Sequence, residues 1–368
     1  MGVFRYILDH SDHVFIVFCI ALLILLRQYL RRENFYTLII SSLLSFALVE
    51  GICRLENIGS PEVAVWREER VKGNNSPYIY KPNGKLRYHY PDNPRGYFDE
   101  KNEVLGTINA KGFRGLDRSF EKESRKIRLA FLGDSFTLGL GVRDEDTLPA
   151  DVEHELQKNY GNVEVLNFGV TDSDTSDQIK LLEKYVLEFK PDIVVIVLFL
   201  NDANRTATIE FLSRPWVFTK IRKHSYFINA FVGSIEKIIM SKKMIRHYRE
   251  GFLEDSPGYQ SIKSALRKGK LLSSEHQFYF VVALYPLPFQ LNERYPFRFI
   301  HQMIEDFCAA ENIPFVDLFN AFLGKRDKEM WVHPTDQHPN EVAHRLAARE
   351  LTDYLKKERF IDKVLEKY

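Results

Sequence analysis

The sequence predicts an α/β fold in which a parallel sheet of about five strands is covered by helices on both faces. Short apolar runs alternate with segments of helical period from residue 127 onward. One of these runs, DIVVIVLFL, lacks the polar alternation of a half-exposed strand, as expected for a strand that is buried on both faces. The 368 residues, of which 45% are hydrophobic, suffice for one large domain and an accessory region.

The individual elements follow from the length and period of each segment. The predicted strands cover residues 127–132, 163–168, 193–200, 278–284 and 315–318. The predicted helices cover residues 148–160, 175–190, 297–311 and 341–357. Neither an internal repeat nor a low-complexity segment interrupts this alternation, which indicates a single layered domain over residues 121–360.

Two charge-free apolar runs, at 14–26 and 35–49, precede this domain. Both are shorter than the ~20 residues that span a bilayer, but flanking Tyr and Arg side chains extend them. We expect a transmembrane helical hairpin within residues 1–55; a cleaved signal peptide is disfavoured because a second run follows at once, and a soluble core hairpin is the alternative. Arg27, Arg31 and Arg32 place the loop in the cytoplasm by the positive-inside rule, so both chain ends face outward.

Residues 56–120 are rich in Pro, Gly, Tyr and Asn and have no sustained helical period. They indicate a largely extended accessory segment that buttresses the following domain, with substrate contact by its tyrosines as the alternative. A second unusual region is an insertion at about 203–270, which is longer than ordinary connections. Between Arg214 and Lys270 it holds thirteen basic and four acidic residues. An anionic polymer, anionic lipid headgroups and a merely solvated helical face all stay open as explanations.

Three polar or small residues, Ser135, Gly169 and Asn201, fall where predicted strands end, the sheet edge at which ligands bind in open α/β folds. Ser135 follows the first strand at a glycine turn, and a serine nucleophile needs a base and donors for the oxyanion. His338, in a polar loop before the last helix, can supply the base, and Asp336 can accept its other ring N–H. Gly169 closes the second strand and offers a backbone N–H, while Asn201 closes the third and offers an amide.

Four spaced blocks occur in order over roughly two hundred residues. They are GDS at 133–135, NFG at 167–169, ND at 201–202 and DQHPN at 336–340. This set resembles the SGNH, or GDSL, hydrolase superfamily, and NAKGFRG at 109–115 is similar to a block in its membrane-anchored bacterial members. The resemblance implies a flavodoxin-like three-layer sandwich and no cofactor or metal. It also implies a Ser135, His338 and Asp336 triad and an oxyanion hole of Ser135, Gly169 and Asn201.

Two positions depart from the pattern of that superfamily. Its acid more often lies three residues before the histidine, where this chain has Thr335, so Asp336 or a backbone carbonyl orients His338. Phe199 and Leu200 precede Asn201, where the superfamily usually has a glycine.

Several other kinds of site are disfavoured by the sequence. The nucleophile elbow Gly-x-Ser-x-Gly is absent, and neither glycine-rich nucleotide-binding pattern is complete. His333, Asp336 and His338 fit no strong metal-ligand spacing. The net charge of +1 gives no indication of nucleic-acid binding.

Together these observations predict a membrane-anchored serine esterase of the cell (inner) membrane with an extracytoplasmic catalytic domain. The expected substrate is an O-acyl, and in particular O-acetyl, ester on a cell-envelope glycan, a lipid-linked compound or a small molecule, and membrane lipid is the expected partner. An O-acyltransferase that uses the same residues and a non-catalytic envelope assembly protein are the alternatives. The sequence makes no prediction of oligomeric state.

Overall fold

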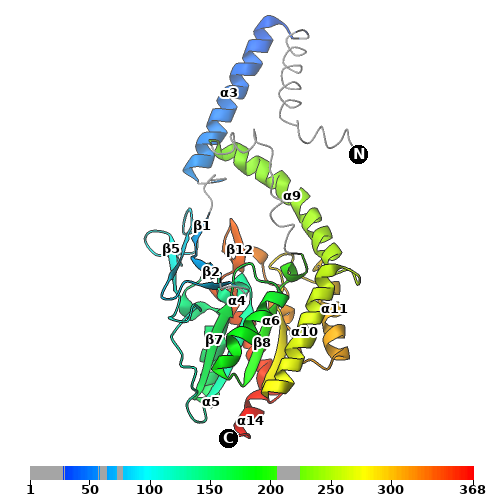
Figure 1. Ribbon diagram of the computed structural model, residues 1–368. Coiled ribbons are helices and arrows are strands. Elements are labelled where there is room, and N and C mark those ends of the chain that lie inside the picture. The colour runs from blue at the N-terminus through cyan, green and yellow to red at the C-terminus, as the bar shows by residue number, and fades with distance from the viewer. Residues whose placement is uncertain (1–27, 29, 57, 59–63, 73–77, 205–223) are drawn as a thin grey trace. The chain divides into compact units, whose positions relative to one another are not determined.

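The computed structural model describes residues 28, 30–56, 58, 64–72, 78–204 and 224–368 (Figure 1). Contacts divide the chain into two units. The larger unit comprises residues 64–205 and 245–368, and the smaller one comprises residues 1–63 and 206–244.

A five-stranded parallel sheet forms the centre of the larger unit, in the order β10-β9-β8-β6-β7. Its strands are β6 (Ile127–Gly133), β7 (Val163–Gly169), β8 (Ile193–Leu198), β9 (Tyr279–Leu284) and β10 (Phe315–Asp317). Every residue of β6, β7 and β8 is buried, as their unbroken apolar runs predict. The predicted α/β fold is therefore confirmed.

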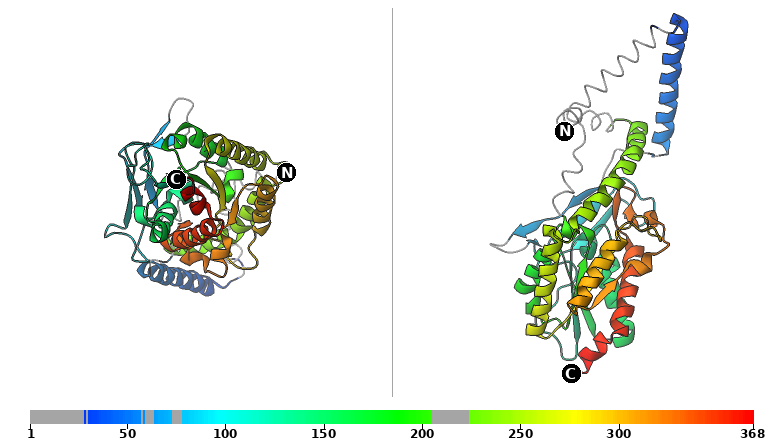
Figure 2. Two further views of the ribbon diagram at one scale, coloured as in Figure 1. Left: turned by 90° about the horizontal axis from the view of Figure 1, so that it is seen from below. Right: turned by 90° about the vertical axis from the view of Figure 1, so that its right-hand side faces the viewer.

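Helices cover both faces of this sheet (Figure 2). They are α4 (Ser135–Leu138), α5 (Leu148–Tyr160), α6 (Thr175–Lys184), α10 (Pro257–His276), α11 (Arg298–Ala310), α12 (Phe319–Phe322), α13 (Glu341–Lys357) and α14 (Phe360–Leu365). Helix α5 packs against α13 on one face, and α6 packs against α10 on the other. Helix, sheet and helix thus make three layers around the apolar strands.

The structure differs from the sequence analysis in the length of one predicted helix and in the content of the basic insertion. The helix predicted over 175–190 ends at Lys184, because Tyr185 leaves the helical region with φ of −131° and a 3-10 turn, Val186–Phe189, follows. The predicted basic insertion contains α10, the crossover helix between β8 and β9, which buries an apolar stripe that includes Ile262 and Leu266. This part of the insertion therefore packs into the core of the larger unit. Residues 205–223 of the insertion lie outside the described residues.

Small antiparallel sheets precede the first parallel strand. Strands β1 (Val65–Arg67), β4 (Lys85–His89) and β5 (Glu103–Thr107) pair in the order β1-β4-β5, and are called the accessory sheet below. Strand β2 (Arg70–Lys72) pairs with β3 (Tyr78–Tyr80), and near the C-terminus β11 (Trp331–His333) pairs with β12 (Asp336–Pro339). Residues of β4 are alternately exposed and buried, as in a strand with one face on the core. The predicted segment boundaries, 56–120, stay a prediction.

The smaller unit contains α3 (Arg32–Leu55) and the first part of α9 (Tyr226–Gly251). Helix α3 is the one described helix that is long and apolar enough to cross a membrane, with a mean hydropathy of 1.8. Core helices and signal sequences also meet this criterion, but only 6% of its apolar window is buried. The other predicted membrane helix, at 14–26, lies outside the described residues.

The end of α3 caps the beginning of α9. The Glu50 carboxylate accepts hydrogen bonds from the Ser225 hydroxyl at 2.8 Å and from the N–H groups of Tyr226 and Phe227 at 3.1 and 3.0 Å. A carboxylate satisfies the first N–H groups of a helix and interacts favourably with its dipole. These bonds join residues that are 175 to 177 positions apart in the sequence.

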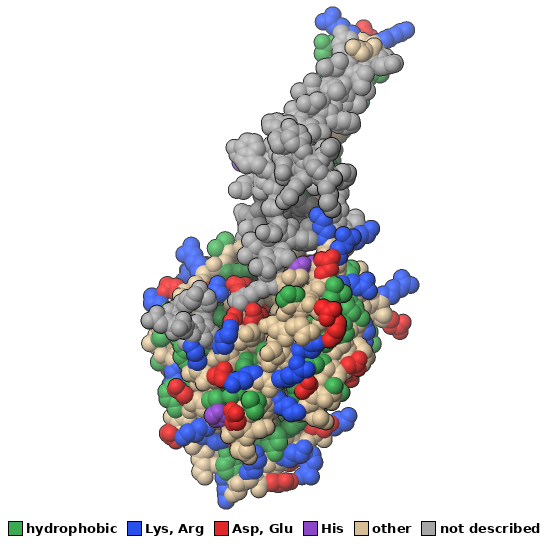
Figure 3. All heavy atoms as spheres, turned by 45° about the vertical axis from the view of Figure 1, so that its right-hand side comes forward, with side chains coloured by type: hydrophobic (Ala, Val, Ile, Leu, Met, Phe, Trp, Pro, Cys, Tyr) green, Lys and Arg blue, Asp and Glu red, His purple; other side chains and the backbone are tan. Residues whose placement is uncertain are grey.

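Charged side chains of both signs are interspersed over the face of the molecule seen in Figure 3. This mixture agrees with a net charge of only +1 and is typical of a solvated protein surface.

Candidate active site

The proposed nucleophile lies on a tight turn at the carboxyl end of β6, with neighbouring strands on both sides. Asp134 is the N-cap of α4, and its side chain accepts the N–H of Phe136 at 2.9 Å. Ser135 is therefore the first residue of the short helix, which ends when Gly139 takes the left-handed conformation with φ of 82°. The turn and its caps hold Ser135 at the sheet edge where ligands bind in such folds.

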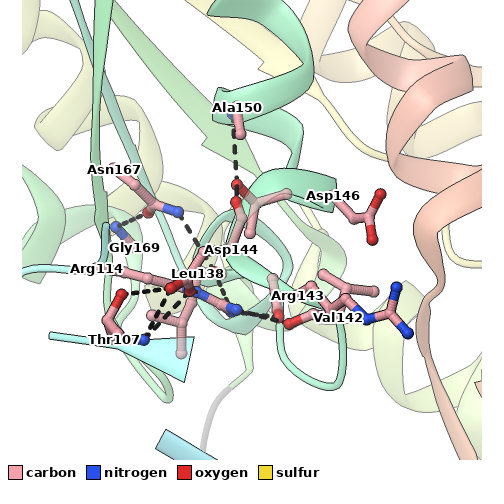
Figure 4. A network of polar contacts seen from close by, with 12 residues as sticks. Thr107, Arg114, Leu138, Val142, Arg143, Asp144, Asp146, Ala150, Asn167 and Gly169 are labelled. Carbon is pink, nitrogen blue, oxygen red and sulfur yellow. Dashed lines mark hydrogen bonds and ion pairs between the residues drawn. The ribbon is translucent and has the colours of Figure 1, made fainter. Parts of the chain in front are cut away.

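Arg114, from the NAKGFRG block, holds this turn from behind (Figure 4). Its buried guanidinium donates to the carbonyl groups of Leu138, Gly139 and Val142 at 2.8, 2.5 and 2.6 Å and to Asp144 Oδ1 at 2.8 Å. A cation satisfies carbonyl groups that the end of a helix leaves without partners. The block therefore has a structural explanation: it fixes the segment that follows Ser135.

Strand β7 approaches the same turn from the side. Asn167 donates from Nδ2 to the carbonyl of Thr137 at 3.0 Å, and its Oδ1 accepts the N–H of Gly169 at 2.9 Å. A Cβ atom on residue 169 would lie 2.1 Å from the backbone nitrogen of Leu138, so only glycine permits this approach. The Gly169 N–H, which the sequence analysis expects to face an oxyanion, is donated to Asn167 within the same strand (Figure 4).

Asn201 reaches the nucleophile turn from the end of β8. It lies in the 3-10 turn Leu200–Ala203, and its Nδ2 donates to Asp134 Oδ2 at 3.0 Å. A carboxamide carries two N–H donors, of which Asp134 accepts one. The absence of the expected glycine before Asn201 thus does not prevent its side chain from reaching the Ser135 turn.

His338 and Asp336 lie on β12, opposite this turn. The Nε2 atom of His338 lies 3.0 Å from Ser135 Oγ, and its Nδ1 lies 2.6 Å from Asp336 Oδ1. The same carboxylate oxygen accepts the backbone N–H of His338 at 3.1 Å. Asn340, the N-cap of α13, fixes the end of the hairpin. The structure thus brings Ser135, His338 and Asp336 together, and Asp336 rather than a backbone carbonyl contacts the imidazole.

The charges around the imidazole favour its protonated form. Burial alone would lower the pKa of His338, but the charge and hydrogen bond of Asp336 raise it, with further contributions from Asp134 and Glu68. Burial alone would raise the pKa of Asp336, but the charge and hydrogen bonds of His338, together with the Tyr90 hydroxyl, lower it. The pair therefore favours an ionised aspartate next to the imidazole, as a general base requires.

Three side chains that the sequence analysis did not single out, Trp66, Glu68 and Arg70, lie on the segment from β1 to the start of β2 and contact residues near the site. The Trp66 ring meets the His338 ring edge to face, with centroids 5.5 Å apart. Glu68 accepts the hydroxyl of Thr171 at 2.9 Å, and Arg70 donates to the Thr171 carbonyl at 2.8 Å. Residues 66, 68 and 70 are spaced two apart, as residues on one face of an extended segment are, and this spacing is a local signal that could have indicated them.

His333, whose spacing to Asp336 and His338 fits no strong metal-ligand pattern, has hydrogen-bond partners other than these two residues. Its Nδ1 lies 2.7 Å from the Thr335 hydroxyl and its Nε2 lies 2.5 Å from Asp92 Oδ1. Within the part of the chain that the structure describes, no three His, Cys, Asp or Glu side chains form a metal-binding group.

A serine at the carboxyl edge of a parallel sheet, with an imidazole in hydrogen-bond contact, is the arrangement of a hydrolase that uses an activated hydroxyl. The chain belongs to the GDSL-like lipase/acylhydrolase family, whose sequence model matches residues 131–346. The protein is accordingly a hydrolase of ester bonds.

Three solved structures to which the chain is similar at low sequence identity are Axe2, TesA and a two-domain esterase. Axe2, an acetylxylan esterase from Geobacillus stearothermophilus, is 19% identical, with 62% of this chain and 94% of that chain covered and a TM-score of 0.40. TesA is 16% identical, with 62% and 98% covered and a TM-score of 0.42. A two-domain esterase active on acetylated mannans is 18% identical, with 63% and 49% covered and a TM-score of 0.39. No curated protein matches the chain by sequence.

Proposed function

We propose that the protein is a membrane-anchored serine esterase that removes O-acyl groups, in particular acetyl groups, from a cell-envelope glycan or a lipid-linked compound. The observation that carries this proposal is the hydrogen-bond chain from Ser135 Oγ through His338 to Asp336, with contacts of 3.0 and 2.6 Å. In a chain of the acylhydrolase family, this arrangement supports a serine nucleophile.

The proposed reaction has two stages. The Ser135 oxygen attacks the ester carbonyl carbon while His338 Nε2 takes the hydroxyl proton, and the tetrahedral intermediate collapses as that proton passes to the departing alcohol. Water then attacks the acyl-serine, His338 accepts a proton from the water, and the proton returns to Ser135 as the carboxylic acid leaves. Asp336 keeps the proton of the neutral imidazole on Nδ1, so that the unprotonated Nε2 faces Ser135.

The oxyanion of each tetrahedral intermediate needs donors that are in place before the reaction. We assign this role to the Ser135 N–H at the first position of α4 and to the second N–H of the Asn201 amide. Asp134 supports this assignment because it orients Asn201 through a 3.0 Å bond and starts the helix through the N–H of Phe136. Gly169 contributes by letting β7 pack against α4.

Hydrolysis of p-nitrophenyl acetate by the full-length protein tests this mechanism. Ser135→Ala should lower kcat/KM by at least about a thousandfold, since removal of a serine nucleophile has effects of this order or larger. A fluorophosphonate probe should label the wild type, and the label should disappear in Ser135→Ala and in His338→Ala. His154→Ala is the matched control, because it also removes an imidazole but from an exposed position on α5. Wild-type turnover by Ser135→Ala rejects the proposal.

The acyl group and its carrier require a separate screen. Trp66 is 45% exposed while its ring contacts His338, so it offers an aromatic surface beside the reacting centre for the apolar face of a sugar. We expect acetylated glycans to be cleaved with a higher kcat/KM than p-nitrophenyl esters of long acyl chains. Analysis of the products with a glycan hydroxyl acceptor present distinguishes release of acetate from transfer. The opposite order of substrates excludes the glycan.

We further propose that α3 anchors the protein in the membrane with the catalytic unit outside the cytoplasm. The apolar side chains Leu43, Leu44 and Leu48 are largely exposed along the helix, as on a surface that lipid covers. The capping of α9 by Glu50 supports a retained anchor, because a cleaved signal peptide would leave the N–H groups of Tyr226 and Phe227 without this acceptor.

Membrane fractionation and protease treatment of intact spheroplasts test this topology. The full-length chain should sediment with membranes and stay there after a high-salt wash, and external protease should degrade the C-terminal region. Protection of that region from protease rejects the proposed orientation, and release by salt rejects the anchor.

A further inference from the structure

The accessory sheet places one tyrosine inside the hydrolytic centre. In β4 the buried positions alternate with exposed ones, and Leu86, Tyr88 and Tyr90 share the parity that faces the core. All three side chains are fully buried. Tyr90, the first residue after the strand, continues this face toward the hairpin that carries His338.

Packing fixes the position of the Tyr90 ring. It stacks on Phe98 with centroids 4.4 Å apart and a tilt of 8°, and the His333 ring lies 5.4 Å away. Opposite its hydroxyl, a Cβ atom on residue 141 would lie 2.4 Å from the Tyr90 oxygen, and this residue is Gly141 with φ of 80°. Packing on several sides therefore leaves the hydroxyl one position.

In that position the Tyr90 hydroxyl donates to Asp336 Oδ2 at 2.9 Å, and both side chains are buried. The other carboxylate oxygen, Oδ1, accepts from the Nδ1 and the backbone N of His338. The two oxygens thus have different partners on opposite sides. Rotation of the carboxylate plane would weaken both sets of bonds at once, because each set depends on the direction of its donor.

The electrostatic surroundings agree with a permanent donor at this position. Burial raises the pKa of Tyr90 well above its usual value, and the neighbouring charge of Asp336 raises it further. The hydroxyl therefore keeps its proton over the whole pH range in which an esterase is assayed. A charge-assisted hydrogen bond from such a donor is stronger than one between neutral groups.

We propose that Tyr90 is a positioning residue of the esterase, which acts through Asp336 to hold the imidazole of His338 against Ser135. The inference rests on the proposed triad and extends it to a residue outside the region that matches the family. It also links the accessory sheet to the active centre. Trp66 on β1, which pairs with Tyr88 on β4, contacts the His338 ring. Tyr90, which directly follows β4, contacts Asp336.

The proposal predicts a particular kinetic effect for Tyr90→Phe. This change removes one hydroxyl and keeps the ring in its seat, so kcat should fall on the order of tenfold, which corresponds to one hydrogen bond to a charged group. KM should stay close to the wild-type value, since Tyr90 does not touch the substrate in this proposal. Tyr97→Phe is the matched control, because its hydroxyl bonds Asp146, a carboxylate outside the site.

The pH profile separates positioning from general packing. The charged groups that face His338 are Asp336 on its own hairpin, Asp134 at the nucleophile turn and Glu68 after β1, while Tyr90 faces Asp336. Loss of the Tyr90 donor leaves more negative charge on Asp336 toward the imidazole, so the acid limb of kcat/KM should move to higher pH. A loss of packing alone changes the melting temperature and leaves that limb in place.

A double-mutant cycle in the full-length protein completes the test. In an Asp336→Asn background the additional Tyr90→Phe change should have no more than a twofold effect on kcat, because the residue through which Tyr90 acts is already altered. An equal loss in both backgrounds, or a wild-type rate and acid limb in the single variant, overturns the inference. Absence of Ser135-dependent turnover in the wild type instead contradicts the proposed function itself.

Discussion

The two ends of strand β6 each have a buried arginine beside them, and the two arginines have different surroundings. At the beginning of the strand, Arg128 donates to Glu164 and to the carbonyl groups of Phe120 and Phe189. At the other end, Arg114 donates to carbonyl groups of the Ser135 turn and to Asp144. Both guanidinium groups are almost completely buried.

The difference lies in what each arginine leaves for other groups. Around Arg128 the charged side chains are paired with one another. Asp192 accepts the backbone N–H of Arg128 and also forms an ion pair with Lys122. At the Ser135 turn, Arg114 donates hydrogen bonds to carbonyl groups only. The backbone N–H and the hydroxyl of Ser135 are therefore not used by Arg114, and the hydroxyl faces His338. Arg128 thus belongs to a structural network at one end of the sheet, whereas Arg114 positions the turn that carries Ser135 at the other end.

The strongest test of this comparison is to replace each arginine with methionine. Each change leaves several carbonyl groups without their donor and removes the nearest cation of a carboxylate, Asp144 or Glu164. Each should therefore lower the free energy of unfolding by about 3–5 kcal/mol. Thermal and urea denaturation of the full-length protein measure this loss.

Activity per folded molecule then distinguishes the two ends. Arg114→Met should lower kcat by on the order of tenfold to a hundredfold, because the Ser135 turn shifts relative to His338. Arg128→Met should leave kcat within about twofold of wild type once the folded fraction is taken into account. Equal kcat losses in the two variants would remove the functional contrast between the ends.

A smaller effect is expected from Glu68→Gln at the catalytic end. Because only the neutral imidazole accepts a proton, the rate of ester hydrolysis should rise with pH through a midpoint above 6.5, the usual value from which the pKa of His338 is raised. Removing the Glu68 carboxylate should move this midpoint to lower pH by less than about one unit. The neighbouring Glu69→Gln is the matched control, as its side chain pairs with Lys81. An unchanged midpoint contradicts the contribution of Glu68.

The smallest effect is expected at the opposite end of the sheet, from Lys122→Met. The Lys122 ammonium lies 2.6 Å from Asp192, and both side chains are about one-sixth exposed. Its removal should lower the free energy of unfolding by about 1 kcal/mol and leave kcat and the pH profile unchanged. A measurable change in kcat would mean that this end is coupled to the chemistry.

The fold was predictable where the apolar pattern and the burial coincide. The unbroken apolar runs of β6 and β8 allowed their assignment as buried parallel strands, and α5 and α13 match the predicted ranges. Helix α10 was not predicted because the excess of basic residues in the insertion, such as Lys268 and Lys270, indicated an exposed segment, although Ile262 and Leu266 form a buried stripe. Composition indicated a surface, whereas the period indicated a core helix.

The site was predictable where the chemistry is local to a sequence block. Ser135, His338 and Asp336 were predicted from their places near strand ends and before a helix together with four sequence blocks that resemble a known superfamily, and the structure brings them together. The hydrogen bond of the Gly169 N–H to Asn167 depends on how β7 approaches α4, which no local pattern encodes. Tyr90 was not singled out for the same reason, since nothing in residues 85–90 indicates residue 336.

The contacts of the active centre join distant parts of the chain, and this separation limits when the centre forms during synthesis. Ser135 and His338 are 203 residues apart, and Tyr90 and Asp336 are 246 apart. A nascent chain that has completed β6 and β7 already carries Ser135, but the proposed base and acid are still untranslated. Under the proposed mechanism the chain therefore stays inert on the ribosome until the final hairpin emerges and these long-range contacts form, which is entropically the slowest class of contact to form.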